Sequence, residues 1–331
     1  MSVTGQTALV IGASGFLGSH VVRALVGQGR NVRIMVRSSS DTRATDDLPI
    51  DRVVGDISDV DALRRAMNGC STVYYCVVDT RAWLRDPAPL YHTNVTCLQT
   101  VLDMALETAI ERFVFTSTFA TIGRNASGVS SESDGFDWWD EAPDYVRCRV
   151  QAEELLFRYQ REKGLPAVAC CVGNTYGSND LQPTPHGQMI KDVATGAMSA
   201  VWDGGGPCVG IEDAATAMLL AADRGRVGER YIVAERWLDY DEMFAIAAAR
   251  ANREPPKRRI PLPIIYAMAW CADRVSSLTG KDNRFSVASL KCSRLLPNVD
   301  ASKARKELGW QPRPVAEAIE DAVDYYLTHP R

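Results

Sequence analysis

Short apolar runs and amphipathic segments alternate through the first two thirds of the chain. The apolar runs predict β-strands at residues 8–11, 32–36, 52–54, 72–78, 112–116, 167–172 and 230–233. Apolar residues at helical spacing predict helices between them, among them residues 62–67, 98–106 and 150–163. Strands that alternate with helices form βαβ units, so the sequence predicts the α/β class with a doubly wound parallel sheet.

The first predicted strand runs directly into three glycines, Gly12, Gly15 and Gly18, and an amphipathic helix follows. Gly12 permits a tight turn, Gly15 lets the backbone approach a phosphate, and Gly18 allows close packing of helix on strand. The start of the helix then binds the pyrophosphate of a dinucleotide, so we predict a Rossmann-type cofactor site and not a turn without a ligand. The residues assigned to this turn are Gly12, Ser14, Gly15, Phe16, Leu17 and Gly18.

The composition excludes several other classes of protein. The 331 residues carry a net charge of −4, which provides no basic surface for nucleic acid. The nine cysteines are odd in number and include no Cys-x-x-Cys pair. We expect reduced thiols of a cytoplasmic protein, and neither a disulfide framework nor a metal site. Residues 1–6 lack a basic region followed by an apolar run, so no signal peptide is expected.

The residues after the second and third strands bear on the choice of cofactor. NAD sites place an acidic residue after the second strand to bind the ribose hydroxyls, and this chain has Arg37 there. Because an arginine suits a 2′-phosphate, NADP is favoured over NAD, the other interpretation of Arg37 being a solvated loop cation. Asp56 and Ile57 follow the third strand and are expected near the adenine, although Asp56 is equally suited to cap the next helix.

Further motifs lie beyond the nucleotide turn. The fifth strand ends in Thr116-Ser117-Thr118, and the segment from Tyr145 to Glu153 follows it. With the GxxGxxG turn and the C-terminal segment 299–310, these motifs resemble the extended short-chain dehydrogenase/reductase family. The resemblance is to the branch that holds 3β-hydroxysteroid dehydrogenases, dihydroflavonol reductases, and sugar-nucleotide epimerases and dehydratases, and it covers nearly the whole chain.

The resemblance implies roles for three residues. Tyr145 would exchange a proton with the substrate oxygen, and Thr118, in place of the family's serine, would position that oxygen. Arg149 stands where the family has a lysine that binds the nicotinamide ribose, and its charge is expected to bring the pKa of Tyr145 below about 10. A literal Tyr-x-x-x-Lys at residues 159–163 is interpreted as a decoy, because it closes the far end of the long helix. Further cofactor contacts are implied for Val77, Val78, Thr116, Val172 and Asn174.

The alternation of strands and helices loosens after about residue 175. We therefore predict an NADP-binding domain at residues 1–175 and a smaller, mainly substrate-binding lobe at residues 176–331. Residues 205–235 are expected to return to the first domain, since they contain the last predicted strand. A final amphipathic helix is predicted at residues 314–327.

The longest apolar stretch, residues 260–272, is interrupted by Pro261 and Pro263. It is too short to cross a bilayer, which needs about 20 residues. Because three cations precede it at residues 257–259, two roles stay open: a helix that covers the substrate pocket, or a helix anchored on a membrane surface. We favour the first, since this length is typical of a core helix.

Loop residues expected near the reactive end of the cofactor favour an apolar substrate. They are Trp83, Trp138, Tyr176, His186 and Met189. We predict an enzyme that transfers a hydride between NADP(H) and a hydroxyl or carbonyl carbon of a fairly apolar small molecule. Two alternatives stay open: a sugar-nucleotide epimerase or dehydratase with a tightly bound cofactor, for which Arg253 and residues 257–259 offer cations, and an NADP(H) sensor without turnover.

The expected partners are a small-molecule substrate and a second copy of the chain, with no nucleic acid and no membrane span. Residues 94–106 and 145–163 are predicted to lie side by side as helices, and many relatives dimerise through such a pair. We predict a homodimer from that resemblance and from the apolar positions of the longer helix. These positions are Val150, Leu155, Leu156 and Phe157.

Overall fold

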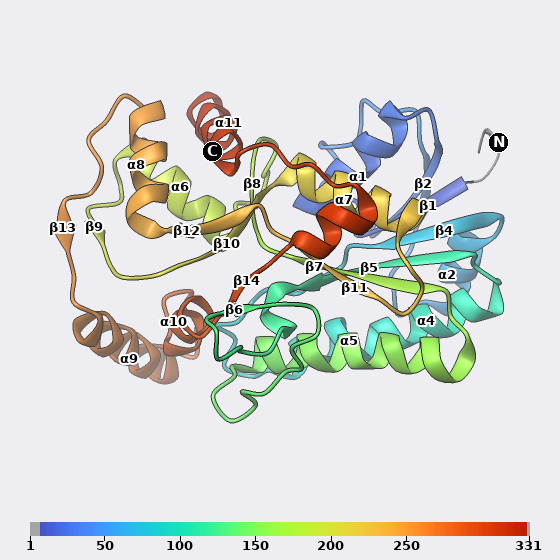
Figure 1. The fold of residues 1–331 in the computed structure, drawn as a ribbon, viewed down its shortest axis with the longest axis horizontal. Coiled ribbons are helices and arrows are strands. Elements are labelled where there is room, and N and C mark those ends of the chain that lie inside the picture. Colours follow the sequence, from blue (N-terminus) through green and yellow to red (C-terminus); the bar gives the residue numbers. More distant parts are fainter. Residues whose placement is uncertain (1–6, 330–331) are drawn as a thin grey trace.

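The computed structural model describes residues 7–329, so the expected lack of a signal peptide in residues 1–6 lies outside it. All seven predicted strands lie in one parallel sheet with the order β11-β7-β5-β4-β1-β2-β3 (Figure 1). They are β1 (Thr7–Ile11), β2 (Asn31–Val36), β3 (Asp51–Val54), β4 (Cys70–Tyr75), β5 (Arg112–Thr118), β7 (Ala167–Val172) and β11 (Arg230–Val233). The predicted doubly wound α/β fold is confirmed.

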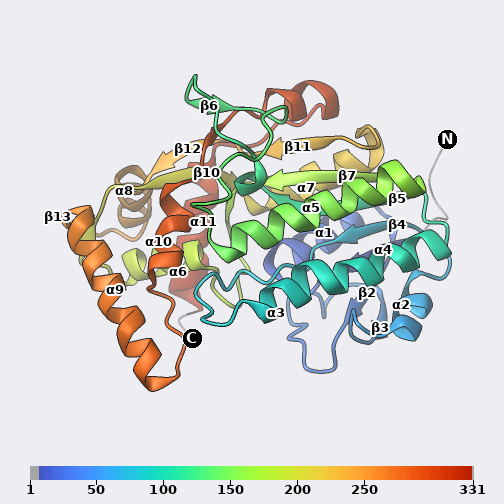
Figure 2. The ribbon, with the colours of Figure 1, turned by 90° about the horizontal axis from the view of Figure 1, so that it is seen from below.

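Helices cover both faces of this sheet, as Figures 1 and 2 show. One face holds α1 (Phe16–Gly27) and α7 (Ile211–Arg224), and the other holds α2 (Val60–Met67), α4 (Cys97–Glu107) and α5 (Asp144–Lys163). Successive side chains of a strand point to opposite faces, so Val10 lies in one core while Leu9 and Ile11 lie in the other. Both faces are buried, which explains why the strands are continuous apolar runs.

Of the boundaries that differ from the sequence prediction, two shape the site. The long helix α5 begins at Asp144 and not at residue 150, directly after an extended Pro143. Strand β4 ends at Tyr75 and not at residue 78, so the chain from Cys76 onward leaves the sheet. Tyr145 therefore lies in the first turn of a helix, and residues 76–80 form a loop at the carboxyl end of the sheet.

The small lobe is built on a second sheet with the order β12-β10-β8. Its elements are β8 (Asn174–Tyr176), β10 (Gly205–Gly210), β12 (Arg236–Asp239), α6 (Pro185–Thr195), α8 (Tyr240–Arg250) and α11 (Val315–Thr328). Their apolar side chains form a separate core. Within the segment 205–235, β11 joins the large sheet and α7 packs on it, whereas β10 belongs to the small sheet. The chain thus crosses between the two sheets twice after residue 175.

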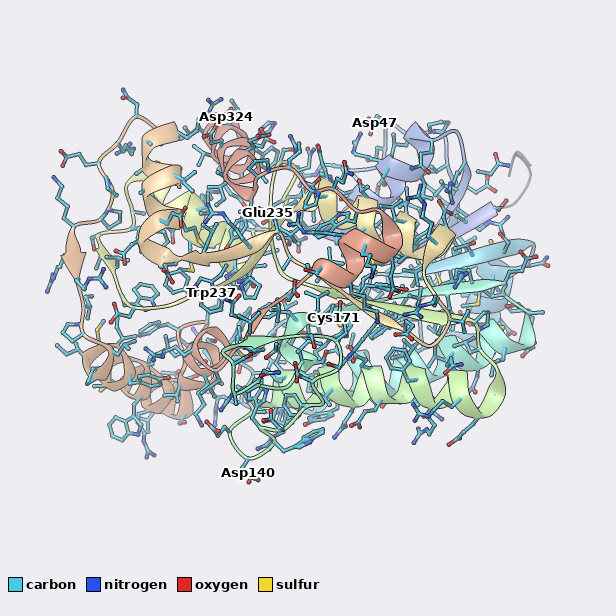
Figure 3. The ribbon with its side chains drawn as sticks, in the orientation of Figure 1. Asp47, Asp140, Cys171, Glu235, Trp237 and Asp324 are labelled. Atoms are coloured by element: carbon cyan, nitrogen blue, oxygen red, sulfur yellow. The ribbon has the colours of Figure 1, made fainter. Side chains whose placement is uncertain are left out.

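Short elements connect these units. They are α3 (Ala88–Tyr91), the π-helical turns η1 (His92–Thr96) and η3 (Ala304–Leu308), the 3-10 turn η2 (Phe119–Thr121), and the paired short strands β6 (Val129–Ser130) with β14 (Asn298–Val299) and β9 (Ala200–Val201) with β13 (Arg258–Arg259). Helices α9 (Leu262–Thr279) and α10 (Val287–Arg294) lie together beside the small lobe (Figure 2). Between residues 7 and 329, no helix has the length and apolar character needed to cross a membrane. Cys171 of β7 lies in the buried core of the large sheet (Figure 3).

Candidate active site

The glycine turn lies where the order of the large sheet reverses, between β1 and β4. Gly12 has a left-handed φ of 92°, and a Cβ there would lie 2.7 Å from the carbonyl carbon of Cys76. A Cβ on Gly18 would collide with the backbone of Gly12, while Gly15 is exposed at the start of α1. Helix α1 has no side-chain cap, so its first N–H groups are left for a phosphate. Because ligands of doubly wound sheets bind at this reversal, the turn fits a dinucleotide pyrophosphate.

The other residues assigned to the cofactor also lie at the carboxyl ends of the strands. Ser14, Phe16 and Leu17 are partly exposed along the glycine turn, and Val77 and Val78 are partly exposed in the loop that leaves β4. Buried residues complete the set, at the ends of β5 and β7 and the start of β8: Thr116, Val172 and Asn174. All eight positions therefore lie along one edge of the large sheet.

The residues expected at the adenosine end follow β2 and β3. Arg37 and Asp56 are both exposed, and Ile57 packs partly against the sheet core. Hydrogen bonds from the Ser58 hydroxyl and N–H, at 2.7 and 3.0 Å, lower the pKa of Asp56, and the Arg37 charge lowers it further. The cap of α2 is Asp59, which accepts two N–H groups of the first turn. The capping role considered for Asp56 is therefore wrong. The side chain of Arg37 is exposed to solvent at the end of β2.

Arg149 lies in the second turn of α5 and is completely buried. Its Nη2 donates to the carbonyl oxygen of Thr116, and its Nη1 donates to Oδ1 of Asn94 over 3.4 Å. The guanidinium carbon lies 5.1 Å from the ring centroid of Phe115. Its Nε has no partner, and no carboxylate of residues 7–329 forms an ion pair with it. The end of β5 thus holds a permanent cation with an unused donor, which a polar group of a bound cofactor would satisfy.

Asn94, which the sequence analysis did not assign, links Arg149 to the loop after β4. Its Oδ1 accepts the N–H of Asp79 at 3.1 Å in addition to Arg149, and its Nδ2 donates to the Asp79 carbonyl at 3.0 Å and to Cys148 Sγ at 3.4 Å. A fully buried amide with four partners is held in one orientation. In the sequence, the only sign of this role was a single asparagine on an apolar helical face that continues at Leu98. In the structure, Asn94 lies in a π-helical turn, a feature that is frequent at functional sites.

Tyr145 lies one turn before Arg149. Burial raises the pKa of its hydroxyl to about 12, and the charge of Arg149 opposes this shift only in part. The expected pKa below about 10 is therefore wrong for this structure. The physical reason is that Cys292 of α10 and Leu295 beyond it lie in one apolar cluster with Tyr145. The phenol is consequently neutral at physiological pH, the form that donates a proton to a substrate oxygen.

Thr118 ends β5 and caps the short turn η2. Its Oγ1 accepts the N–H of Ala120 at 3.3 Å, which leaves the hydroxyl proton as a donor. Its carbonyl accepts the hydroxyl of Thr121 at 2.8 Å. The strand end is thus held from both sides, with a hydroxyl donor of the kind that orients a carbonyl oxygen.

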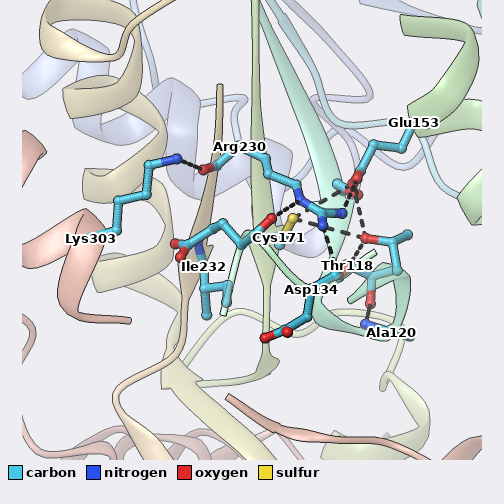
Figure 4. Close-up of polar contacts among 11 residues, drawn as sticks. Thr118, Ala120, Asp134, Glu153, Cys171, Arg230, Ile232 and Lys303 are labelled. Atoms are coloured by element: carbon cyan, nitrogen blue, oxygen red, sulfur yellow. Dashed lines mark hydrogen bonds and ion pairs between the residues drawn. The ribbon is translucent and has the colours of Figure 1, made fainter. Parts of the chain in front are cut away.

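A buried ion pair between α5 and β11 supports the end of β5 (Figure 4). Glu153 of α5 accepts hydrogen bonds from the hydroxyls of Ser117 and Thr121 and pairs with Arg230 of β11 at 2.8 Å. Arg230 also donates to two carbonyl oxygens of the loop after β6, at 2.9 and 3.0 Å. Such a satisfied network fixes the relative positions of β5, α5 and β11. Glu153 is therefore a positioning residue and not a member of the reacting set.

The second Tyr-x-x-x-Lys sequence lies at the other end of α5. The Tyr159 hydroxyl donates to Asp103 of α4 at 2.7 Å, and Lys163 contacts the same carboxylate at 3.3 Å. The Lys163 ammonium also lies 3.9 Å from the centroid of the Tyr159 ring. These contacts join α5 to α4 and use both side chains for packing between helices.

The five residues expected near the substrate separate into two groups. Trp83 is half-buried in the loop after β4, and Trp138 is buried in the apolar cluster that also holds the tyrosine of the first α5 turn. Tyr176 is 1% exposed in the core of the small lobe, with Met189 packed at the margin of that core. His186 lies 6.5 Å from the Tyr176 ring, and burial lowers its pKa to about 4. Tyr176 is thus a core residue, and His186 is a neutral imidazole at physiological pH.

The fold and the site define a Rossmann-type enzyme that uses a dinucleotide, and comparisons with known proteins give the family. The profile of the NAD-dependent epimerase/dehydratase family matches residues 8–234. Sterol demethylase protein B of Methylococcus capsulatus is 29% identical over 97% of this chain and 98% of its own. The 4-hydroxy-2-methyl-3-oxo-4-farnesyl-3,4-dihydroquinoline-1-oxide ketoreductase of Stigmatella aurantiaca is 30% identical over 68% of this chain and 67% of its own. The crystal structure of gox2253 has a TM-score of 0.87 and 31% identity, covering 98% and 99% of the two chains.

The chain therefore belongs to the NAD-dependent epimerase/dehydratase family, which confirms the resemblance to the extended short-chain dehydrogenases and reductases. It is an enzyme of a family that binds a nicotinamide cofactor. When bound, that cofactor supplies the hydride.

Proposed function

We propose that this enzyme transfers a hydride between NADP(H) and the hydroxyl or carbonyl carbon of a fairly apolar small molecule. The observation that carries the proposal is that Thr118 ends β5 while Tyr145 and Arg149 lie in the first two turns of α5, with Arg149 hydrogen-bonded to Thr116 of the same strand. The glycine turn lies at the same edge of the sheet. Tyr145 supplies the proton, Thr118 the hydrogen bond to the substrate oxygen, and Arg149 a fixed positive charge. One relative is named a ketoreductase and another a sterol demethylase protein, which supports reduction of an apolar substrate.

Turnover is tested by following the oxidation of NADPH with a panel of ketones and aldehydes. Tyr145→Phe is expected to abolish turnover and to leave NADPH affinity within about twofold, because only the proton donor is lost. Tyr159→Phe removes a hydroxyl from the far end of the same helix and should keep the wild-type rate. A wild-type rate in Tyr145→Phe contradicts the assignment. Tight binding of NADPH without turnover of any compound would instead favour the sensor alternative.

The preference for NADP(H) over NAD(H) is proposed from Arg37, which stands exposed after β2. A charge-assisted hydrogen bond to the 2′-phosphate contributes about 1.5–3 kcal/mol, or roughly 10- to 150-fold in affinity. Titration of both cofactors should show this preference in the wild type and its loss in Arg37→Ala. Arg43→Ala is the matched control, since Arg43 lies in the same loop and pairs with Asp41. Equal wild-type affinities for the two cofactors would refute the proposal.

A sugar-nucleotide epimerase or dehydratase is the second candidate, because the family description includes both activities. Such an enzyme needs cations that converge on a diphosphate. Arg259 instead pairs with Asp203 and Asp241, and Lys257 pairs with Glu254, on the outer side of the small lobe. The test is whether cofactor stays bound through purification and returns to its starting redox state after each turnover. Net consumption of added NADPH favours the reductase.

The homodimer is also a proposal, and its interface cannot use three of the four apolar positions named above. Val150, Leu155 and Leu156 are buried against the chain's own core, whereas Phe157 is only partly buried. Positions of α5 that face outward are polar, among them Glu154 and Arg158. A dimer through α4 and α5 would therefore rest on charged contacts, and its stability should fall with salt. Light scattering that gives a monomer mass at every protein concentration contradicts the dimer.

We further propose a cytoplasmic location. All nine cysteines are free thiols, and six of them are buried. Reducing compartments keep such thiols unpaired. Fractionation of cells that express the tagged full chain tests this location, and recovery of the protein outside the cytoplasm would contradict it.

A further inference from the structure

Helix α9 has two apolar faces, and the protein covers only one of them. On the covered face, Ile265 and Ala269 are buried in a cluster with Leu290 of α10. The adjacent face carries apolar side chains at the spacing of successive helical turns, all of them exposed: Ile264, Met268, Cys271, Val275 and Leu278. Leu278 is 88% exposed. Single exposed apolar residues are ordinary, but a stripe along an 18-residue helix marks an interaction surface.

The segment that contains this helix is cationic. Residues 257–294 contain eight lysines and arginines against two aspartates, in a chain whose net charge is −4. Within residues 7–329, the ion pairs of this segment use Lys257 and Arg259 only, so Arg274, Lys281 and Lys291 are exposed cations without an ion pair. Both aspartates accept backbone N–H groups of neighbouring segments. An apolar helix face in a segment rich in unpaired cations matches the surface of an anionic bilayer.

A second copy of the chain is the other occupant with a suitable shape, since apolar residues spaced three and four apart can form a seam between two helices. The charges argue against it. In a symmetric dimer the same cations would flank the seam on both copies and repel one another. An anionic surface converts this repulsion into attraction.

Helix α9 is attached to elements that surround the catalytic tyrosine. It packs on α10, whose Cys292 shares a cluster with Tyr145. It also contacts the loop after β4, where Nη1 of Arg85 donates to the carbonyl of Ser276 at 3.4 Å. Trp83 of that loop lies 5.4 Å from the guanidinium of Arg284, in the segment between α9 and α10. Figure 2 shows α9 at the outer end of the molecule, with α10 between it and the sheet. A surface bound to α9 is therefore on the side of the enzyme that holds the tyrosine.

We propose that α9 is a membrane-interface helix that binds the surface of an anionic lipid bilayer. Its stripe, which includes Met268, Val275 and Leu278, enters the headgroup region, and the flanking cations contact lipid phosphates. Such a helix lies in the plane of the membrane with its apolar face about 5–10 Å deep, so no segment crosses the bilayer. The binding goes beyond the reaction assigned to the site and does not depend on it.

The test is co-sedimentation of the full chain with vesicles of phosphatidylcholine, with and without about a third of phosphatidylglycerol. We expect binding to the anionic vesicles, at least about tenfold weaker binding to the neutral ones, and release as salt rises from about 0.05 to 0.5 M. Cys271 is the one exposed cysteine within residues 7–329, so an environment-sensitive dye on it should shift to the blue when anionic vesicles are added.

The double variant Met268→Ser/Leu278→Ser should lose on the order of tenfold or more in vesicle affinity. Val227→Ser/Leu327→Ser is the matched control, because these side chains are 46% and 45% exposed on other surfaces. It should bind as the wild type does. The proposal is overturned by an absence of vesicle binding, or by equal, salt-insensitive binding to neutral vesicles. It is equally overturned by a lipid-free dimer that Met268→Ser/Leu278→Ser abolishes, which would identify α9 as a contact between copies.

Discussion

Arg149 offers a sharp test of the site, because its charge is buried without a carboxylate partner among residues 7–329. Removing a cation from water costs several kcal/mol even after the protein relaxes around it. Against this cost stand two hydrogen bonds from the charged guanidinium, to Thr116 and Asn94, and its contact with the Phe115 ring. These two sets of effects nearly cancel, so Arg149 contributes little net stability.

The magnitude follows from the individual contributions. Arg149→Met keeps the length of the side chain and loses two hydrogen bonds of about 1.5–3 kcal/mol each and a cation–π contact of about 1 kcal/mol. It also recovers the several kcal/mol of desolvation. We therefore expect the free energy of unfolding of Arg149→Met to lie within about 2 kcal/mol of the wild type. Arg149→Ala leaves a cavity in addition and should lose a further 2–5 kcal/mol or so.

Urea unfolding, followed by circular dichroism, measures these differences, and titration with NADPH measures the functional effect. Arg149→Met should lose cofactor affinity and turnover despite its near-native stability, whereas Arg149→Lys retains the charge and should stay active. Two results would refute the reasoning. A loss above about 4 kcal/mol in Arg149→Met would make the guanidinium a structural group. Wild-type cofactor affinity and turnover in the same variant would place it outside the site.

Three further predictions concern single positions. Gly12→Ala should cost about 2–5 kcal/mol and abolish the NADPH-dependent rise in melting temperature, since its Cβ would lie 2.7 Å from the Cys76 backbone at a φ of 92°. The pKa of His186 is lowered to about 4, so below pH 7 the unfolded chain binds a proton more tightly than the folded protein does. The free energy of unfolding should therefore fall by about 2 kcal/mol between pH 7 and 5, and His186→Asn should not show this loss. Tyr145 is neutral up to about pH 12, so alcohol oxidation should accelerate tenfold per pH unit through pH 10, while carbonyl reduction should show no loss there. A pH-independent oxidation rate would contradict the last prediction.

The large sheet was predictable because most of its strands are apolar runs next to helical segments, as residues 8–11 are, although only a loop separates β2 from β3. The small sheet was not, since β10 begins with Gly205, Gly206 and Pro207, which carry no strand pattern. Its glycines are required by contacts from distant segments: a Cβ on Gly206 would lie 2.7 Å from the side-chain nitrogen Nδ2 of Asn174. Such contacts become visible only when the chain is folded.

The site was predictable to the extent that its residues occur in local motifs. The glycine turn, Thr118, Tyr145 and Arg149 all stand in such segments. Asn94 and Arg230 act through partners far along the chain: one holds the loop at Asp79, and the other pairs with Glu153. A polar residue on an apolar face is a signal of burial, but it does not identify the partner.

The pKa of Tyr145 shows how a local pattern can give the wrong sign. The spacing of Tyr145 and Arg149 places them one helical turn apart, which favours the phenolate when nothing else is considered. The opposing effect is burial in an apolar cluster that includes Trp138 and Cys292 of α10, and no local pattern connects Cys292 with Tyr145. Arg149 also directs its donors to Thr116 and Asn94. Burial is therefore the larger effect, and it keeps the phenol of Tyr145 neutral at physiological pH.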